Sequence, residues 1–253
     1  MSKKLIVANW KMNPQTPSEA EKIFLGIAEI AKNSKNTEVV VCAPFVFLPF
    51  LKKKNNKKIV LGAQNVYAEL EGAYTGEISP KMLSSLGVKY VIIGHSERRA
   101  EGEKNEFIAK KVKQSLKCGL TPIICVGERE RDHGHLYLGV VKHQVEEALS
   151  LIPKANIKNV VIAYEPVWAI GKNALRAATA EESMEMSIFI KKTLADMVGP
   201  QMAHSVRVLY GASVDPKNTS DFILHGGVDG LLVGRDSLNP KKFDMIINSV
   251  GNL

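Results

Sequence analysis

The sequence predicts an α/β fold, a closed (β/α)8 barrel built by a single domain over residues 1–253. Eight short runs rich in Val, Ile and Leu recur along the chain, and most precede a stretch with helical periodicity or a helix-start signal. A chain of 253 residues, 45% of them hydrophobic, is long enough for one large core, and no linker divides it. The alternative, a doubly wound open sheet, would usually carry a glycine-rich turn where the first strand is here followed by Asn9-Trp-Lys-Met-Asn13.

The predicted strands are apolar nearly throughout, which is typical of parallel strands that are covered on both faces. In chain order they are residues 5–8, 39–42, 59–61, 90–93, 122–126, 160–163, 206–209 and 231–233.

Several of the intervening helices have recognisable ends. Residues 16–19, Thr-Pro-Ser-Glu, combine a capping box with proline at the first helical position, and Ser79-Pro80 repeats the proline. Residues 106–116 place their apolar side chains on one face. A further helix is expected to open at residues 179–182, Thr-Ala-Glu-Glu, and to end before Gly199.

The net charge of +8 permits binding to nucleic acid or to an anionic membrane but does not argue for it. The densest basic stretch, residues 52–58, has no aromatic residues on which bases could stack and is interpreted as a solvated loop, so neither partner is expected. No apolar run approaches the ~20 residues needed to cross a bilayer, and the first residues lead into a strand without a signal-peptide pattern. Cys42, Cys118 and Cys125 cannot all pair, so we expect reduced thiols in a cytoplasmic protein.

Polar residues follow several of the predicted strands, and in a barrel the carboxyl ends of all strands converge on one face. They are Asn9 and Lys11 after the first strand, Gln64 and Asn65 after the third, His95, Ser96 and Glu97 after the fourth, and Glu165 after the sixth. Glycine-bearing turns at residues 210–213 and 233–236 follow the last two strands, where barrels often bind phosphate through backbone N–H groups. An isolated Glu165 would be interpreted as a salt-bridge residue. Followed by a loop with Pro, Trp and Gly, it has the position of a base beneath a lid.

Seven segments, in order and over essentially the whole chain, resemble the triosephosphate isomerase family. They are ANWKMN, AQN with GAYTGEIS, IIGHSERR, ICVGE, AYEPVWAIG, YGASV and DGLLVG. The resemblance implies a TIM barrel and an isomerase of glycolysis and gluconeogenesis. Its triose phosphate substrates would be dihydroxyacetone phosphate and D-glyceraldehyde 3-phosphate, interconverted by proton transfer through an enediolate.

The resemblance also implies roles for the strand-end residues. Glu165 would be the base, His95 a neutral imidazole that donates to the substrate carbonyl, and Lys11 a cation that stabilises the enediolate and the phosphate. Asn9 would hold a substrate oxygen near His95. This division follows a physical need, because a carboxylate alone cannot deprotonate such a carbon at useful rates unless donors stabilise the charge that develops on oxygen.

Supporting positions are implied around these groups. Glu97 would orient the ammonium of Lys11, with a structural ion pair to an arginine as the alternative, and Ser96 lies beside it in the same motif. Residues 166 to about 177 would form a lid that shields the enediolate from water. The expected phosphate-binding groups are Gly171, Ser213 and the backbone N–H groups of Gly234 and Arg235. The expected apolar walls around the base are Ile170 and Leu232.

Other chemistries fit the residues less well. Cys125 has no associated His-Asp pair, so a buried thiol is expected rather than a nucleophile. The two histidines of Asp132-His-Gly-His135 lie in a charged loop, and no metal site is expected. An internal proton transfer also needs no cofactor.

The chain departs from the family pattern at three places, of which Ala212 in place of glycine in the strand-seven turn adds only a methyl group. The lid hinge, Lys172 to Ala178, is about two residues longer than the usual Gly-Thr-Gly-Lys-Thr-Ala, which is expected to alter closure. The last turn has Arg235 and Asp236 where the family has Gly and Ala, and Asp236 would oppose a dianionic substrate unless it points away or pairs with Arg235. A barrel that acts on another phosphorylated sugar remains an alternative, and the departures in the lid and the last turn leave open a non-catalytic descendant.

The expected assembly also rests on the resemblance. Residues 72–77 look like the interlocking loop of the family, with Thr75 reaching a neighbour's site near Asn9 and Lys11. A homodimer is therefore expected, and a tetramer remains open.

Overall fold

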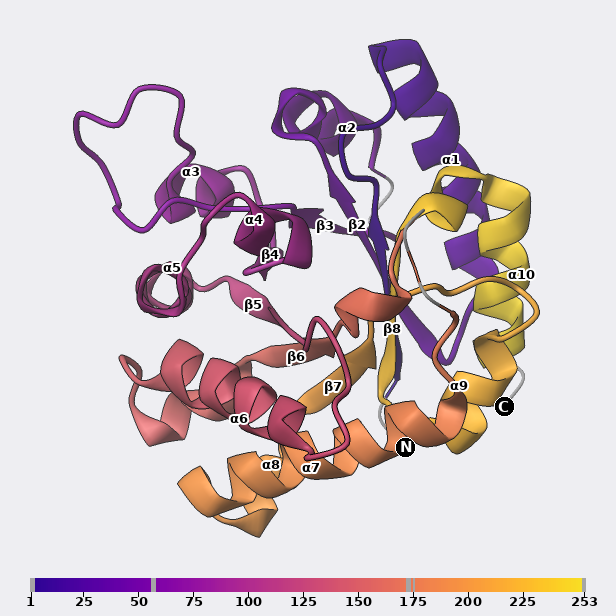
Figure 1. Ribbon diagram of the computed structural model, residues 1–253. Helices are drawn as coiled ribbons and strands as arrows, with labels where there is room; N and C mark the ends of the chain where they lie inside the picture. Colours follow the sequence, from indigo (N-terminus) through magenta and orange to yellow (C-terminus); the bar gives the residue numbers. More distant parts are fainter. Residues whose placement is uncertain (1–2, 56–57, 172–173, 175, 252–253) are drawn as a thin grey trace.

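A computed structural model describes residues 3–55, 58–171, 174 and 176–251. Within these residues eight parallel strands close into a barrel in which each strand pairs with its neighbours in the sequence and β1 pairs with β8 (Figure 1). The strands are β1 (Lys4–Asn9), β2 (Thr37–Ala43), β3 (Val60–Ala63), β4 (Tyr90–Ile93), β5 (Thr121–Val126), β6 (Val161–Tyr164), β7 (Arg207–Tyr210) and β8 (Gly230–Val233). The predicted barrel is confirmed, and every predicted strand overlaps an observed one.

The apolar runs are explained by two buried layers. Leu5 and Val7 of β1 belong to a cluster inside the barrel, whereas Ile6 and Ala8 belong to the layer between the strands and the helices. Successive side chains of a strand point to opposite faces, so a strand with both faces covered must be apolar at every position. Each fully buried Leu or Ile contributes about 1.5–3 kcal/mol to folding.

Helices surround the barrel, and the chain winds from strand to outer helix and back (Figure 1). The α-helices are α1 (Pro17–Asn33), α2 (Leu48–Lys54), α3 (Pro80–Ser85), α4 (Ser96–Ala100), α5 (Asn105–Lys117), α6 (Leu136–Leu149), α7 (Ala180–Val198), α8 (Pro200–Ser205), α9 (Thr219–His225) and α10 (Pro240–Gly251). The 3-10 turns are η1 (Phe45–Phe47), η2 (Lys154–Asn159), η3 (Val167–Ala169) and η4 (Arg235–Leu238).

The predicted helix starts are capped as expected. Thr16 accepts from the backbone N–H of Glu19 at 3.3 Å, and Glu19 accepts from that of Thr16 at 3.2 Å. Thr179 and Glu182 repeat this reciprocal capping box at 3.3 and 2.9 Å. Each N-cap is worth about 1 kcal/mol. The helix that starts here, α7, ends at Val198, before Gly199, as predicted.

Three segments differ from or add to the expectation. The first lysines of the basic stretch, Lys52–Lys54, form the last turn of α2 instead of a loop, where cations favour the negative end of the helix. The short helix α8 directly follows Gly199 and was not predicted; its first residue is proline, which is well suited to that position. Asp132 accepts from the backbone N–H groups of Leu136 and Tyr137, both at 3.0 Å, and so caps α6.

None of the helices in the described ranges is long and apolar enough to cross a membrane.

Candidate active site

The carboxyl ends of β1, β4 and β6 bring together five of the predicted site residues. Lys11 Nζ donates to Glu97 Oε1 at 2.6 Å. The backbone N–H of Ser96 donates to Glu165 Oε2 at 3.0 Å, and His95 Nε2 lies 3.4 Å from Glu165 Oε1. A candidate base, a candidate electrophile and a cation therefore share one end of the barrel.

The backbone of Lys11 is held in an uncommon conformation. Its φ is +53°, a left-handed value that costs a residue with a side chain roughly 1–2 kcal/mol. Asn9 Oδ1 accepts from the Lys11 N–H at 3.1 Å, and Gln64 Nε2 donates to the Lys11 carbonyl at 2.8 Å. Gln64 also donates to the carbonyl of Cys42 at 2.9 Å, which fixes its amide between β1 and β2. These bonds compensate the strain and aim the Lys11 side chain.

Glu97 pairs with Lys11, and no arginine among the described residues pairs with it. The two side chains are 59% and 32% exposed, so solvent weakens the pair and its contribution to stability is at most about 1 kcal/mol. The contact matters more for position, because it fixes the ammonium at the mouth of the barrel.

His95 begins α4 and caps it through its own ring. Its Nδ1 accepts from the backbone N–H of Glu97 at 3.2 Å. A nitrogen that accepts a hydrogen bond carries no proton, so this geometry places the proton of the neutral ring on Nε2. The ring therefore presents an N–H donor on the side of Glu165.

Glu165 is 1% exposed and has one satisfied oxygen and one free oxygen. Oε2 accepts from Ser96, whereas Oε1 has no hydrogen-bond partner in the described part of the chain. A buried carboxylate oxygen without a hydrogen-bond partner lowers stability, so its presence calls for a functional explanation. A free lone pair beside an imidazole donor is suited to accepting a proton.

The surroundings of Glu165 are close and apolar. A Cβ at Gly211 would lie 3.1 Å from Glu165 Cγ and 3.5 Å from Leu232 Cβ, so a side chain there would crowd Glu165 and require it to shift by a few tenths of an ångström. Leu232 is itself 2% exposed. Burial, and next the charge of Glu165, hold the pKa of the Cys125 thiol well above its usual value, which supports the interpretation of Cys125 as an inert thiol.

The segment after Glu165 is anchored by Glu128. Its Oε1 accepts from Tyr164 Oη and Trp168 Nε1, both at 2.8 Å, and its backbone carbonyl accepts from the N–H of Val167 at 2.9 Å. The start of the expected lid is thereby tied to the loop after β5.

The far end of this segment reaches back to its start. The guanidinium of Arg176 donates to the two carboxylate oxygens of Glu182 at 2.8 and 2.5 Å and lies 4.6 Å from the ring centre of Trp168. Of the altered hinge, Lys172, Asn173 and Leu175 lie outside the described residues.

A cavity of about 530 Å³ opens beside these groups. It is lined mainly by polar and small residues, with a few larger apolar ones: Asn9, Trp10, Lys11, Asn13, Glu97, Ile170, Gly171, Ala177, Ala212, Ser213, Val214, Asp215, Asn218, Gly234, Arg235, Asp236 and Leu238. The expected substrate-binding residues are all among them. Ser213 Oγ donates to the carbonyl of Ala169 at 2.7 Å, so the cavity wall contacts the segment that follows the base.

The turn after β8 is fixed by Ser237, whose N–H and hydroxyl donate to the carbonyl of Gly234 at 3.0 and 2.7 Å. Non-glycine residues with positive φ in the described chain are Lys11 and His135, so Arg235 is free of that strain. Asp236 pairs with Lys242 Nζ of α10 at 2.9 Å. Of the two arrangements considered for Asp236, pointing away or pairing with Arg235, the pair with Arg235 does not occur among the described residues, because the ammonium of Lys242 takes the carboxylate instead.

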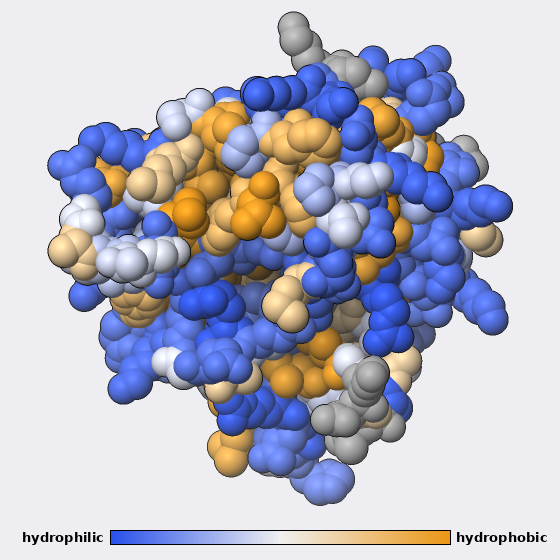
Figure 2. All heavy atoms as spheres, turned by 90° about the horizontal axis from the view of Figure 1, so that it is seen from above, coloured by the Kyte–Doolittle hydropathy of each residue, from blue (hydrophilic) through white to orange (hydrophobic). Residues whose placement is uncertain are grey.

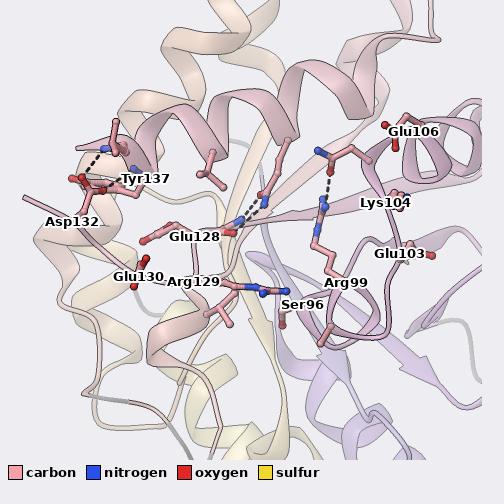
Figure 3. Close-up of a pocket in the computed structure, with 17 residues that line it drawn as sticks. Ser96, Arg99, Glu103, Lys104, Glu106, Glu128, Arg129, Glu130, Asp132 and Tyr137 are labelled. Atoms are coloured by element: carbon pink, nitrogen blue, oxygen red, sulfur yellow. Dashed lines mark hydrogen bonds between the residues drawn. The ribbon is translucent and has the colours of Figure 1, made fainter. Parts of the chain in front are cut away.

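A second and larger cavity, about 900 Å³, lies between α5 and α6 (Figure 3). Its polar side chains hold loops together: Arg99 donates to Asn105 Oδ1 at 2.6 Å, and Gln144 accepts from the N–H of Gly127 at 2.7 Å. It lacks the lysine, the imidazole and the glycine turns, so the smaller cavity is the candidate site. No group of three or more metal-ligating side chains occurs in the described ranges.

Comparison with known proteins agrees with this geometry. The family model described as triosephosphate isomerase matches residues 4–250. The chain belongs to the triosephosphate isomerase family. Curated triosephosphate isomerases from Dictyoglomus thermophilum and Thermoanaerobacter pseudethanolicus are 44% and 46% identical, and each alignment covers 98% of this chain and 100% of the relative. That of Cytophaga hutchinsonii is 42% identical over the same shares.

Three residues of this triosephosphate isomerase family member gained a role only from the structure. Gln64 fixes the Lys11 backbone, Gly211 leaves space for the base, and Glu128 anchors the segment after it. Each lies in a family segment seen in the sequence, but the partner of each is remote along the chain. Thr75, by contrast, is exposed on the loop between β3 and α3, which projects from the barrel (Figure 1).

Proposed function

We propose that Glu165, His95 and Lys11 carry out in this chain the reaction of its family, interconversion of dihydroxyacetone phosphate and D-glyceraldehyde 3-phosphate in glycolysis. The same reaction run in reverse would serve gluconeogenesis. One observation carries the assignment of residues. The buried carboxylate of Glu165 has an oxygen without a partner, 3.4 Å from an imidazole Nε2 and beside a cavity that Lys11 lines.

The three groups divide the chemistry between base and electrophile. Oε1 of Glu165 removes a proton from the carbon next to the substrate carbonyl and returns it to the neighbouring carbon. The Nε2–H of His95 and the ammonium of Lys11 stabilise the negative charge that develops on oxygen. Asn9, which is mostly buried beside Lys11, holds a substrate oxygen, while Glu97 keeps the ammonium in place.

The phosphate binds in the same cavity, on the side of the glycine turns. The proposed contacts are Gly171, Ser213 and the backbone N–H groups of Gly234 and Arg235. Ile170 and Leu232 form the apolar walls near the base. The segment that starts at Pro166 closes over the bound substrate, an interpretation supported by its anchored start and by its contact with Ser213.

Glu165→Gln tests the central assignment. Steady-state assays in both directions, coupled to a dehydrogenase, are expected to show fast turnover for the unchanged chain and a loss of about 10²- to 10⁴-fold in the variant. Glu130→Gln, a change at an exposed glutamate near the second cavity, is the matched control and should leave turnover unchanged. Near-normal turnover of Glu165→Gln would contradict the assignment, and an inactive unchanged chain would favour a non-catalytic descendant.

A homodimer is also proposed, on the evidence of exposed apolar side chains. Met12 (85%), Val46 (78%), Met82 (58%) and Tyr74 are exposed, and Tyr74 lies on the loop that carries Thr75. A view from above also shows apolar patches within a largely hydrophilic surface (Figure 2). In a dimer Thr75 would reach the partner's site. Sedimentation velocity should give twice the chain mass, and Val46→Asp should reduce it to the chain mass.

We also propose a cytoplasmic location and a single domain over residues 1–253. The unpaired state of Cys42, Cys118 and Cys125 supports a reducing compartment, and the continuous closed barrel supports one domain. Cell fractionation tests the compartment, and a single cooperative unfolding transition tests the domain.

A further inference from the structure

We propose that the guanidinium of Arg235 is a second cation of the phosphate site and sets the preference of this chain for a dianionic substrate. The inference rests on the proposed phosphate site. That proposal uses only the backbone N–H of Arg235, whereas this one concerns its side chain. It makes Arg235 a specificity-determining residue that contacts the phosphate.

The first observation is that Arg235 has no competing partner. It is exposed, it lines the cavity of about 530 Å³, and no carboxylate among the described residues forms an ion pair with it. The nearest acid along the chain, Asp236, is held by Lys242 at 2.9 Å. The Asp236 carboxylate is therefore engaged by a cation other than Arg235.

The other carboxylates that line the cavity are also engaged. Oδ1 of Asp215 accepts from the backbone N–H groups of Lys217 and Asn218 at 2.7 and 3.0 Å. Glu97 is paired with Lys11 at 2.6 Å. Arg235 is thus the cation of this lining without a carboxylate partner in the described part of the chain.

The second observation is the position of Arg235 on the wall. A Cβ at Gly234 would lie 3.8 Å from Lys11 Cε, so the residue before Arg235 packs against the stem of the lysine. The turn is fixed by the two bonds from Ser237 to the Gly234 carbonyl. Arg235 and Lys11 therefore belong to the same side of the cavity.

The charge of the site explains why a second cation matters. Glu97 compensates much of the Lys11 charge, and the charged groups Lys11, Glu97, Asp215, Asp236 and Lys242 sum to −1 without Arg235 and to zero with it. A phosphate monoester carries about −1.5 to −2 at pH 7. A guanidinium also matches phosphate with a planar pair of N–H donors.

The test uses Arg235→Ala and Arg235→Lys in the full-length enzyme. Arg235→Ala should raise KM about tenfold and weaken competitive inhibition by inorganic phosphate by the same factor, with kcat within about twofold, as expected for one charge-assisted bond. Arg235→Lys keeps the charge but loses the planar donor pair. Its KM and its inhibition by phosphate should therefore lie between those of the unchanged enzyme and those of Arg235→Ala. Arg129→Ala, a change at an exposed arginine of the second cavity, should leave all these values unchanged.

A phosphate-free substrate separates binding from structure. The kcat/KM for D-glyceraldehyde, which lacks the phosphate, should be the same in Arg235→Ala and the unchanged enzyme. Lys242→Ala should raise KM about threefold, because Asp236 is then free to pair with Arg235 or to repel the phosphate. Lys241→Ala, a change at the adjacent lysine, is its control.

Unchanged KM and unchanged inhibition by phosphate in Arg235→Ala would overturn the proposal. An equal loss with D-glyceraldehyde and with the phosphorylated substrate would also overturn it, because the effect would then be structural. Failure of the proposed function would look different, since it would appear as an active Glu165→Gln variant whatever the result at position 235.

Discussion

Gln64→Ala should lower kcat/KM, although the substitution leaves every proposed reacting side chain unchanged. The Gln64 amide donates to the carbonyls of Lys11 and Cys42 at 2.8 and 2.9 Å. The Cys42 carbonyl keeps a second donor, the N–H of Trp10 at 3.2 Å, but the Lys11 carbonyl loses its bond from the side chain. Without it, Lys11 can relax from its φ of +53°, and its ammonium moves.

The expected size follows from these contacts. Two hydrogen bonds of about 1 kcal/mol each give a loss of about 2 kcal/mol in the free energy of unfolding. For a chain of this length that lowers Tm by roughly 4–8 °C. A displacement of Lys11 Nζ by about 1 Å would lower kcat/KM about 100-fold.

Urea unfolding and steady-state kinetics at one protein concentration measure both effects. Gln64→Glu keeps the shape but loses the donors, so it should lower kcat/KM at least as much as alanine. Ser183→Ala is the control, because it removes one buried bond, to the carbonyl of Gly226 at 3.1 Å, away from the site. Ser183→Ala should lower the free energy of unfolding by about 1 kcal/mol and leave kcat/KM unchanged. A Gln64→Ala enzyme with full kcat/KM would refute the claim that this amide positions Lys11.

Three further predictions concern groups outside the reaction. Lys111→Met should lower the free energy of unfolding by about 1–3 kcal/mol in urea, because the buried carboxylate of Glu103 loses its closer cation and keeps Arg98, whose Nε lies 3.5 Å away; no measurable loss would contradict this. The hydrogen bond from Arg176 lowers the pKa of Glu182, so this stabilisation exists above about pH 4 and is lost as the pH falls through the folded-state pKa. The stability deficit of Glu182→Gln at pH 7 should therefore shrink at pH 3, and equal deficits in urea titrations would argue against the pair. Cys118, the partly exposed thiol, should react first with a thiol reagent, since burial raises the pKa of both strand thiols; simultaneous reaction of all three would be inconsistent with the barrel.

The barrel could be predicted because its signals are local. A strand covered on both faces must be apolar at every position, and the capping boxes at Thr16 and Thr179 need only residues three apart. The helix α8 was missed because Gly199-Pro200 is a stop signal for one helix and, here, also the start of the next.

The reacting residues could be proposed from the sequence because they follow strands whose ends must converge. The residues that position these reacting side chains could not be predicted from the sequence. The amide of Gln64 meets Lys11 from 53 positions away, and Asp236 has a lysine six positions ahead as well as an adjacent arginine. Nothing in the sequence decides between those two cations, because the choice depends on where α10 starts in space.

The hydroxyl of Ser213 has a single proton, and in this structure it is committed to the carbonyl of Ala169 at 2.7 Å. A phosphate oxygen that requires the same proton must displace that carbonyl. The Ser213 hydroxyl can then donate either to a bound phosphate or to the carbonyl of Ala169, but not to both. Because one hydrogen bond would replace another, the exchange would have a small net free energy. In the proposed mechanism, substrate binding would therefore break this contact between the cavity wall and the segment after Glu165.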